Sequence, residues 1–144
     1  MAELNFATGL VEFNVNGVRT ININPSDVGF LETIYALMGK IESIETETTK
    51  KREKADDPAK IFDYFRASDK KMRESVDSVF GDGFCDAVFK DVRLMAMADG
   101  LTVLENFLFA VIDQMDESIK ENMAKRNDRI SKYTAKYEKY HQQK

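Results

Sequence analysis

The chain is poor in the residues that build reactive or cross-linked sites. Its 144 residues include one cysteine, Cys85, one histidine, His141, and no tryptophan. A single cysteine excludes an intramolecular disulfide and a paired-cysteine metal site, and it suggests a reducing compartment. We interpret Cys85 as a small buried hydrophobic residue rather than a nucleophile, because no histidine is near it in the sequence. His141 lies in a polar segment, where neither a catalytic base nor a metal ligand is expected.

Long apolar runs and reactive motifs are also missing. The longest apolar stretch, around residues 107–112, is far shorter than the roughly 20 residues that span a bilayer. The N-terminus has no basic segment followed by an apolar run, so we expect no secretory signal peptide. The sequence contains no glycine-rich phosphate loop and no nucleophile elbow.

Two acidic pairs are the remaining candidates for chemistry. We interpret Asp56-Asp57 as part of a helix cap and the pair Asp82 and Asp86 as a solvated turn. A carboxylate metal site at either pair is the alternative. The sequence therefore predicts a protein that is not an enzyme, binds no cofactor and no metal, and does not enter a membrane.

Charge is distributed unevenly along the chain. Residues 120–144 contain eight basic and three acidic side chains, which makes this tail +5 and the first 119 residues −9. Opposite charges at the two ends favour head-to-tail association or contact with an acidic partner. Solubility alone is the other interpretation.

Residues 9–24 have the pattern of a β-hairpin. Apolar and polar residues alternate on both sides of Asn16-Gly17, a pair that favours the type I′ turn. We expect strands at 9–15 and 18–24. An isolated hairpin is marginal in water, so its apolar face must cover a helix or meet the sheet edge of another chain.

The middle of the chain predicts two long helices and a short one. A helix at about 26–50 would be capped by Asn24 or Ser26, and the charged run 45–57 after it is either a solvated helical extension or a linker. Asp57-Pro58 predicts the start of a second helix, at 58–80. Gly81 and Gly83 then permit turns before a short helix at 84–91.

The last predicted helix begins at a capping box, Thr102 to Glu105, and its apolar residues are dense through residue 119. No glycine or proline interrupts it, and a helix from 102 to 140 would be roughly 58 Å long at ~1.5 Å per residue. Its second half must therefore project, pair or fray. Apolar residues continue there at alternating four- and three-residue spacing, interrupted by Arg126. These candidate partner-binding residues, the tail seam, are Ile119, Met123, Ile130, Tyr133, Tyr137 and Tyr140.

The tail seam permits three interpretations. Tyrosines among basic residues can stack on nucleic-acid bases while the positive charge follows the phosphates. Here the tyrosines follow a helical spacing and the body is acidic, so we expect no nucleic-acid binding. A tail that is merely solvated is the second interpretation. Binding of another helix is the one that the spacing favours, and with the charge asymmetry it predicts a homo-oligomer.

Several segments resemble one family, the tail assembly chaperones of long-tailed (siphovirus-like) phages and prophages. The similar segments are the opening hairpin, the helix beginning NPSD, VDSVFGDGFCDAVFKD and ADGLTVLENFLFAVIDQ. In such families a helix often ends in Val-Phe-Gly, followed by a small-residue turn and a short helix with a Phe near its end. Here these features are Val79 to Gly81, the turn Asp82-Gly83, and Phe84 to Phe89. The resemblance covers roughly Leu4 to Gln114 and leaves out the basic tail.

The resemblance implies a non-enzymatic protein that binds the tape measure protein, a very long helical chain, and keeps it soluble during tail morphogenesis. Such a chaperone would act in the cytoplasm of the bacterial host and be absent from the mature virion. The alternative is a structural virion component, such as a tail-completion or head–tail connector subunit.

The sequence as a whole predicts an α+β fold, mainly α, with an N-terminal hairpin, a small helical bundle and a long C-terminal helix. We expect one globular domain at 1–119 and a basic helical extension at 120–144. The predicted core is Phe13, Ile21, Leu31, Ile34, Met38, Phe62, Phe65, Val79, Phe80, Phe84, Phe89, Leu104, Phe107, Leu108 and Ile112.

Overall fold

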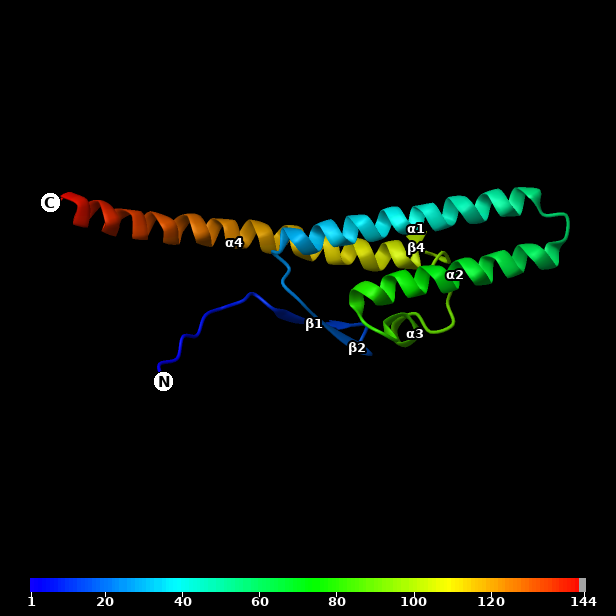
Figure 1. Cartoon of the computed structure of the whole chain (residues 1–144), viewed down its shortest axis with the longest axis horizontal. Helices are drawn as coiled ribbons and strands as arrows, with labels where there is room; N and C mark the ends of the chain where they lie inside the picture. Colours follow the sequence, from blue (N-terminus) through cyan, green and yellow to red (C-terminus); the bar gives the residue numbers. More distant parts are fainter. Residues whose placement is uncertain (143–144) are drawn as a thin grey trace.

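A computed structural model describes the backbone of residues 1–142 and the side chains of residues 1–139. The α+β, mainly α, fold is confirmed: a two-stranded hairpin is followed by helices, the last of them very long (Figure 1). The elements are β1 (Val11–Val15), β2 (Arg19–Ile23), α1 (Val28–Lys54), α2 (Pro58–Phe80), α3 (Phe84–Val88), β3 (Met97–Ala98), β4 (Leu101–Thr102) and α4 (Val103–Gln142).

The β1–β2 hairpin forms around the predicted turn. Asn16 and Gly17 both have positive φ, 51° and 76°, as a type I′ turn requires. The Asn14 side chain supports the turn by accepting a hydrogen bond from the Gly17 amide at 2.7 Å. β1 begins at Val11 rather than at residue 9, because Gly9 has a φ of 77° that breaks the extended backbone.

α1 begins later and ends later than expected. Its N-cap is Asp27, which accepts from the Gly29 amide at 2.9 Å, so the predicted caps Asn24 and Ser26 are wrong. Asn24 instead accepts from the Ser26 amide in a turn, and this turn delays the helix. The charged run is helical through Lys54.

α2 packs antiparallel against α1 and begins as predicted. Asp57 caps the helix by accepting from the Ala59 amide at 3.0 Å, and Pro58 occupies the first turn. Gly81 and Gly83 both have positive φ in the turns that follow. The short helix α3 ends at Val88 rather than 91, since Lys90 adopts a left-handed φ of 51°.

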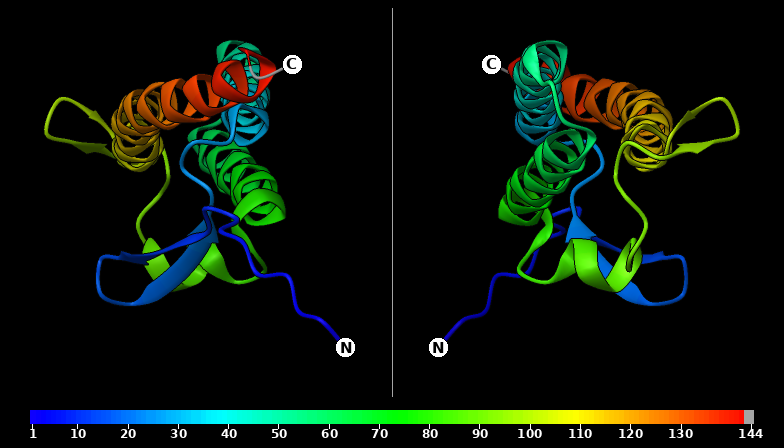
Figure 2. Two further views of the ribbon diagram at one scale, coloured as in Figure 1. Left: turned by 90° about the vertical axis from the view of Figure 1, so that its left-hand side faces the viewer. Right: turned by 90° about the vertical axis from the view of Figure 1, so that its right-hand side faces the viewer.

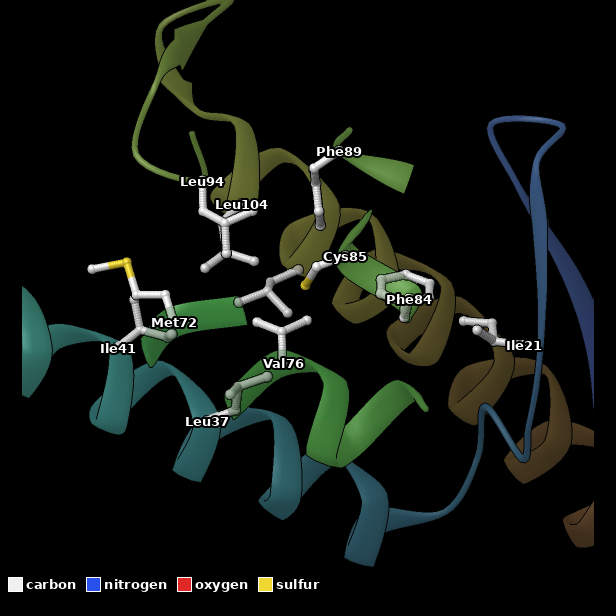
Figure 3. Packing of buried hydrophobic residues seen from close by; sticks show 11 residues of the cluster. Ile21, Leu37, Ile41, Met72, Val76, Phe84, Cys85, Phe89, Leu94 and Leu104 are labelled. Atoms are coloured by element: carbon white, nitrogen blue, oxygen red, sulfur yellow. The ribbon is translucent and has the colours of Figure 1, made fainter. Parts of the chain in front are cut away.

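The core lies where α1, α2, α3 and the first half of α4 meet (Figure 3). Phe84 is fully buried, and Phe80, Phe89 and Phe107 surround its ring at centroid distances of 5.2–6.3 Å. Six predicted core residues are buried, namely Ile21, Ile34, Phe84, Phe89, Leu104 and Leu108, and seven are partly buried, namely Phe13, Leu31, Met38, Val79, Phe80, Phe107 and Ile112. Buried hydrophobic residues that the predicted core left out are Leu37, Ile41, Met72, Val76, Cys85, Leu94, Val111 and Met115.

Two predicted core residues are wrong. Phe62 is 60% exposed and Phe65 is 42% exposed. Both lie in the first half of α2, which extends with α1 beyond α3 and α4, so no third element covers this face (Figure 1).

The molecule is elongated. The α1–α2 hairpin extends at one end and the second half of α4 projects at the other (Figure 1). Seen along the long axis, β1–β2 and α3 lie on one side of the helices, and the small β3–β4 hairpin points outward beside α4 (Figure 2). No helix in the described part of the chain is long and apolar enough to cross a membrane.

Candidate functional site

The tail seam lies on the part of α4 that projects beyond the body (Figure 1). Every residue from 120 to 139 is exposed. Met123 and Ile130 are each 48% exposed, and Tyr133 and Tyr137 are 59% and 69% exposed. Ile119 is half-buried at the edge of the body, and the side chain of Tyr140 lies outside the described residues.

α4 leaves the body at a small polar contact. Met115 is its last fully buried residue. One turn further, the hydroxyls of Ser118 and Ser26 lie 2.8 Å apart, and the Asn122 amide donates to the Ser26 hydroxyl at 2.6 Å. These bonds hold the start of α1 against α4 and fix the direction in which the tail projects.

The charges on the tail are arranged relative to the seam. In a heptad repeat with the seam at positions a and d, Lys120, Arg129 and Lys136 fall beside it, and Arg126 lies within it. The tail's acidic residues, Glu121, Asp128 and Glu138, fall on the opposite half of the helix. The Lys136 ammonium lies 5.6 Å from the centre of the Tyr133 ring, a cation–π contact. The tail therefore offers an apolar stripe with positive flanks.

Two of the grooves on the body lie beside α4. The first, of about 510 Å³, is lined by β1–β2, the end of α3 and the first turns of α4, residues 103–114. We call it the hairpin groove; Phe13, Val15, Phe89 and Val111 are among its apolar residues. The second, of about 370 Å³, lies between α1 and the start of α4, and we call it the α1–α4 groove. Its residues are Met38, Ile41, Glu42, Glu45, Met95, Thr102, Leu104, Glu105, Leu108 and Phe109.

The acidic pairs that the sequence offered as metal sites have structural contacts. Asp57 caps α2, and Asp86 accepts from the Arg73 guanidinium at 3.0 Å. Asp82 contributes its carbonyl, which accepts from the Arg19 guanidinium at 2.8 Å. Within residues 1–139 no group of histidine, cysteine and carboxylate side chains is arranged to hold a metal ion.

The most connected polar cluster was not predicted from the sequence. The buried Asp69 carboxylate accepts from the Leu94 amide and from the Arg73 guanidinium, each at 2.8 Å. Arg73 also donates to the carbonyls of Lys90 and Val92, at 2.8 and 2.7 Å. This cluster fixes the loop between α3 and β3 to α2. No sequence signal beyond the i, i+4 spacing of Asp69 and Arg73 points to it.

Cys85 is buried, as the sequence predicts. Burial raises the pKa of its thiol well above the ordinary value, and a hydrogen bond with the Asp77 side chain adds to the shift. The backbone amide of Cys85 donates to the same carboxylate at 2.8 Å. The thiol is therefore held neutral and is a poor nucleophile.

This environment predicts that Cys85 resists modification. We expect a maleimide or disulfide reagent at pH 8 to label the folded protein at least ~100-fold more slowly than the protein in guanidinium chloride, because labelling needs an exposed thiolate. Mass spectrometry of timed samples measures both rates. Rapid labelling of the folded protein, at a rate near that of a free thiol, would contradict the buried position.

Comparison with known proteins gives one match. A family model described as "Family of unknown function (DUF6673)" matches residues 16–144, a range that includes the whole tail. No curated protein and no solved structure was found to match the chain.

Proposed function

The chain belongs to the DUF6673 family, and we propose that it is a non-enzymatic phage tail assembly chaperone that binds and solubilises the tape measure protein. The observation that carries this proposal is the tail seam, an apolar stripe along a stretch of α4 in which residues 120–139 are all exposed. The tape measure partner itself comes from the resemblance of residues 4–114 to that family of chaperones.

The physical basis is helix-to-helix binding. A long helical client exposes apolar stripes before the tail tube forms around it, and such stripes drive aggregation. A second helix that presents apolar side chains at heptad spacing covers such a stripe by the packing used in coiled coils. The exposed tyrosines supply large contact area with few rotatable bonds, and the basic flanks keep the complex soluble.

The proposal places the protein in the cytoplasm of the bacterial host during assembly and outside the finished particle. A chaperone acts before the tube subunits polymerise, so purified virions should contain none of it. A tail-completion or head–tail connector subunit would remain in purified particles at a fixed copy number. Mass spectrometry of particles from the same phage or prophage separates the two functions.

The direct test is co-expression with the tape measure protein of the same phage or prophage. We expect the tape measure protein to move from the insoluble to the soluble fraction and to co-elute with this chain in size exclusion. The control is co-expression with an unrelated soluble helical protein. If the tape measure protein stays insoluble while this chain is soluble and folded, the proposal is wrong.

The double variant Tyr133→Ala/Tyr137→Ala tests the seam. We expect binding of the tape measure protein to weaken roughly tenfold or more, because buried aromatic anchors carry a large share of helix-binding energy. The melting temperature of the body should stay within about 1 °C, because both side chains are more than half exposed. Calorimetric titration and thermal melts measure the two effects.

The matched control is Ser131→Ala/Lys139→Ala, two exposed tail residues on the half of the helix away from the seam. It should bind the tape measure protein as tightly as the parent chain does. A large fall in melting temperature for the tyrosine variant would instead show that these tyrosines pack within the domain.

A further inference from the structure

The α1–α4 groove has an apolar floor and an acidic rim, a combination suited to a helix that carries an apolar stripe with positive flanks. Its floor consists of apolar side chains from both helices, including the buried Ile41, Leu104 and Leu108. Met38 and Met95 are half-buried at its surface and can adapt to an incoming side chain. Three of its lining residues are acidic and none of them is basic.

The tail seam is complementary to this groove in apolar surface and in charge. Its apolar residues match the apolar floor, and the positive charges beside it match the glutamates of the rim, Glu42, Glu45 and Glu105. Arg126 interrupts the apolar seam and would be a defect in a symmetric coiled coil. In an acidic groove the same arginine gains carboxylate partners.

The hairpin groove lacks this match. Its lining residues are apolar or carry uncharged amides, such as Asn14, Asn106 and Gln114, and none of them is charged. A helix with positive flanks would gain no ion pair there. Charge complementarity therefore selects the α1–α4 groove.

The tail of the same molecule cannot reach this groove. Phe109, in the groove, and Arg129, on the tail, lie on one continuous helix. Twenty residues of helix separate them by roughly 30 Å at ~1.5 Å per residue. Figure 1 shows the tail extending away from α1 and therefore away from the groove. The occupant must come from another molecule.

We infer that the α1–α4 groove binds the tail seam of a second copy of this chain. The donor's Arg126 and Arg129 lie against Glu42 and Glu45 of the acceptor, and the donor's apolar seam covers the groove floor. Every copy carries one donor tail and one acceptor groove, so the contact joins two different surfaces. Such a contact propagates into a ring or an open chain unless two copies exchange tails. The inference goes beyond the proposed function and does not require a client.

The test uses two full-length charge-reversed variants. Glu42→Lys/Glu45→Lys removes the acceptor charge; Glu105 is left intact because its side chain accepts from the Thr102 amide in the capping box. Arg126→Glu/Arg129→Glu removes the donor charge. We expect the parent chain to self-associate with rising concentration in sedimentation velocity, less strongly in high salt. Each variant alone should associate roughly tenfold or more weakly.

Mixing the variants gives the sharper result. The first keeps a normal tail and the second keeps a normal groove, and the reversed tail of the second also complements the reversed groove of the first, so an equimolar mixture should recover the association that each variant alone has lost. The quadruple variant, with both sets of charges reversed, should recover association. The controls Glu3→Lys/Glu74→Lys and Lys125→Glu/Lys139→Glu change the net charge equally at exposed residues outside the groove and seam, and they should associate like the parent chain.

Two outcomes would overturn the inference. One is a parent chain that stays monomeric up to submillimolar concentration. The other is self-association that neither reversal weakens, which would place the contact on another surface, such as the hairpin groove. Because no tape measure protein is present in these experiments, their failure would leave the result of co-expression unaffected.

Discussion

Replacing Phe84 with alanine should lower the free energy of unfolding by about 3–5 kcal/mol, the range observed when a large buried aromatic side chain is truncated to alanine. Phe84 is completely buried, and its ring lies 5.2 Å from both Phe80 and Phe107. The turn at Gly81 and Gly83 fixes the start of α3, so the surrounding chain has little freedom to fill the cavity. Because small domains have only about 5–15 kcal/mol of stability, the variant should be folded but marginal.

Chemical denaturation followed by circular dichroism measures this loss. The matched control is Phe62→Ala, which removes the same side chain from a position that is 60% exposed on α2. It should change the free energy of unfolding by less than about 0.5 kcal/mol. Equal losses for the two variants would mean that the first half of α2 is covered in solution.

This pair of phenylalanines also shows how far the sequence predicts the core. Both residues lie in apolar stripes with helical spacing, and the spacing alone cannot distinguish them. Phe84 follows a glycine turn that points it into the bundle, whereas Phe62 lies where only two helices run side by side. Periodicity identifies an apolar face, but the length of the neighbouring elements decides whether anything covers it.

Several turns and helix caps that depend on a few consecutive residues were predicted correctly from the sequence. Asn16-Gly17, Asp57-Pro58 and the capping box at Thr102 each occupy the predicted role, because each depends on only a few consecutive residues. Asp99-Gly100 carries a turn signal of the same kind, with φ of 54° and 83°, but no hairpin was predicted there. Its strands, β3 and β4, have two residues each, too few to leave a pattern of alternation.

The two parts of the candidate site, the tail seam and the α1–α4 groove, also differ in whether the sequence could predict them. The tail seam could be predicted because heptad spacing is a property of one helix. The α1–α4 groove could not, since its residues come from α1, from the loop before β3 and from α4, segments that lie far apart in the sequence. Only the path of the chain between these helices brings Glu42 and Glu105 to the same rim.

Asp69 should be nearly as important for stability as Phe84, although it is a charged residue. Its carboxylate is 8% exposed and accepts from the Leu94 amide, the Arg73 guanidinium and, at 3.5 Å, the Arg93 guanidinium. In Asp69→Ala, Arg73 keeps its partially buried charge without its closest carboxylate and retains only the exposed carboxylate of Asp86 at 3.0 Å, and the Leu94 amide loses its acceptor. Breaking a buried pair from one side costs about 3–5 kcal/mol, much of it from the group left behind.

The variant Asp69→Asn separates the two contributions. It keeps an oxygen that can accept from the Leu94 amide and removes only the charge, so its loss should be smaller than that of Asp69→Ala. The control is Asp63→Ala, whose carboxylate pairs with Arg66 on the surface of the same helix, with side chains 66% and 56% exposed. An exposed pair contributes at most about 1 kcal/mol. Urea denaturation of the three variants measures these differences.

The hydrogen bond from the Leu94 amide to Asp69 also supports the α1–α4 groove. The Leu94 amide that Asp69 holds belongs to the turn before β3, whose carbonyls accept from the first residues of α4: Leu94 from the Leu104 amide at 3.1 Å and Ala96 from the Val103 amide at 2.8 Å. Releasing this segment loosens the start of α4 and displaces Met95 from the groove. Asp69→Ala, at a temperature where it is still folded, should therefore self-associate more weakly than the parent chain, whereas Asp63→Ala should not. Equal association of both with the parent would show that the groove does not depend on this hydrogen bond.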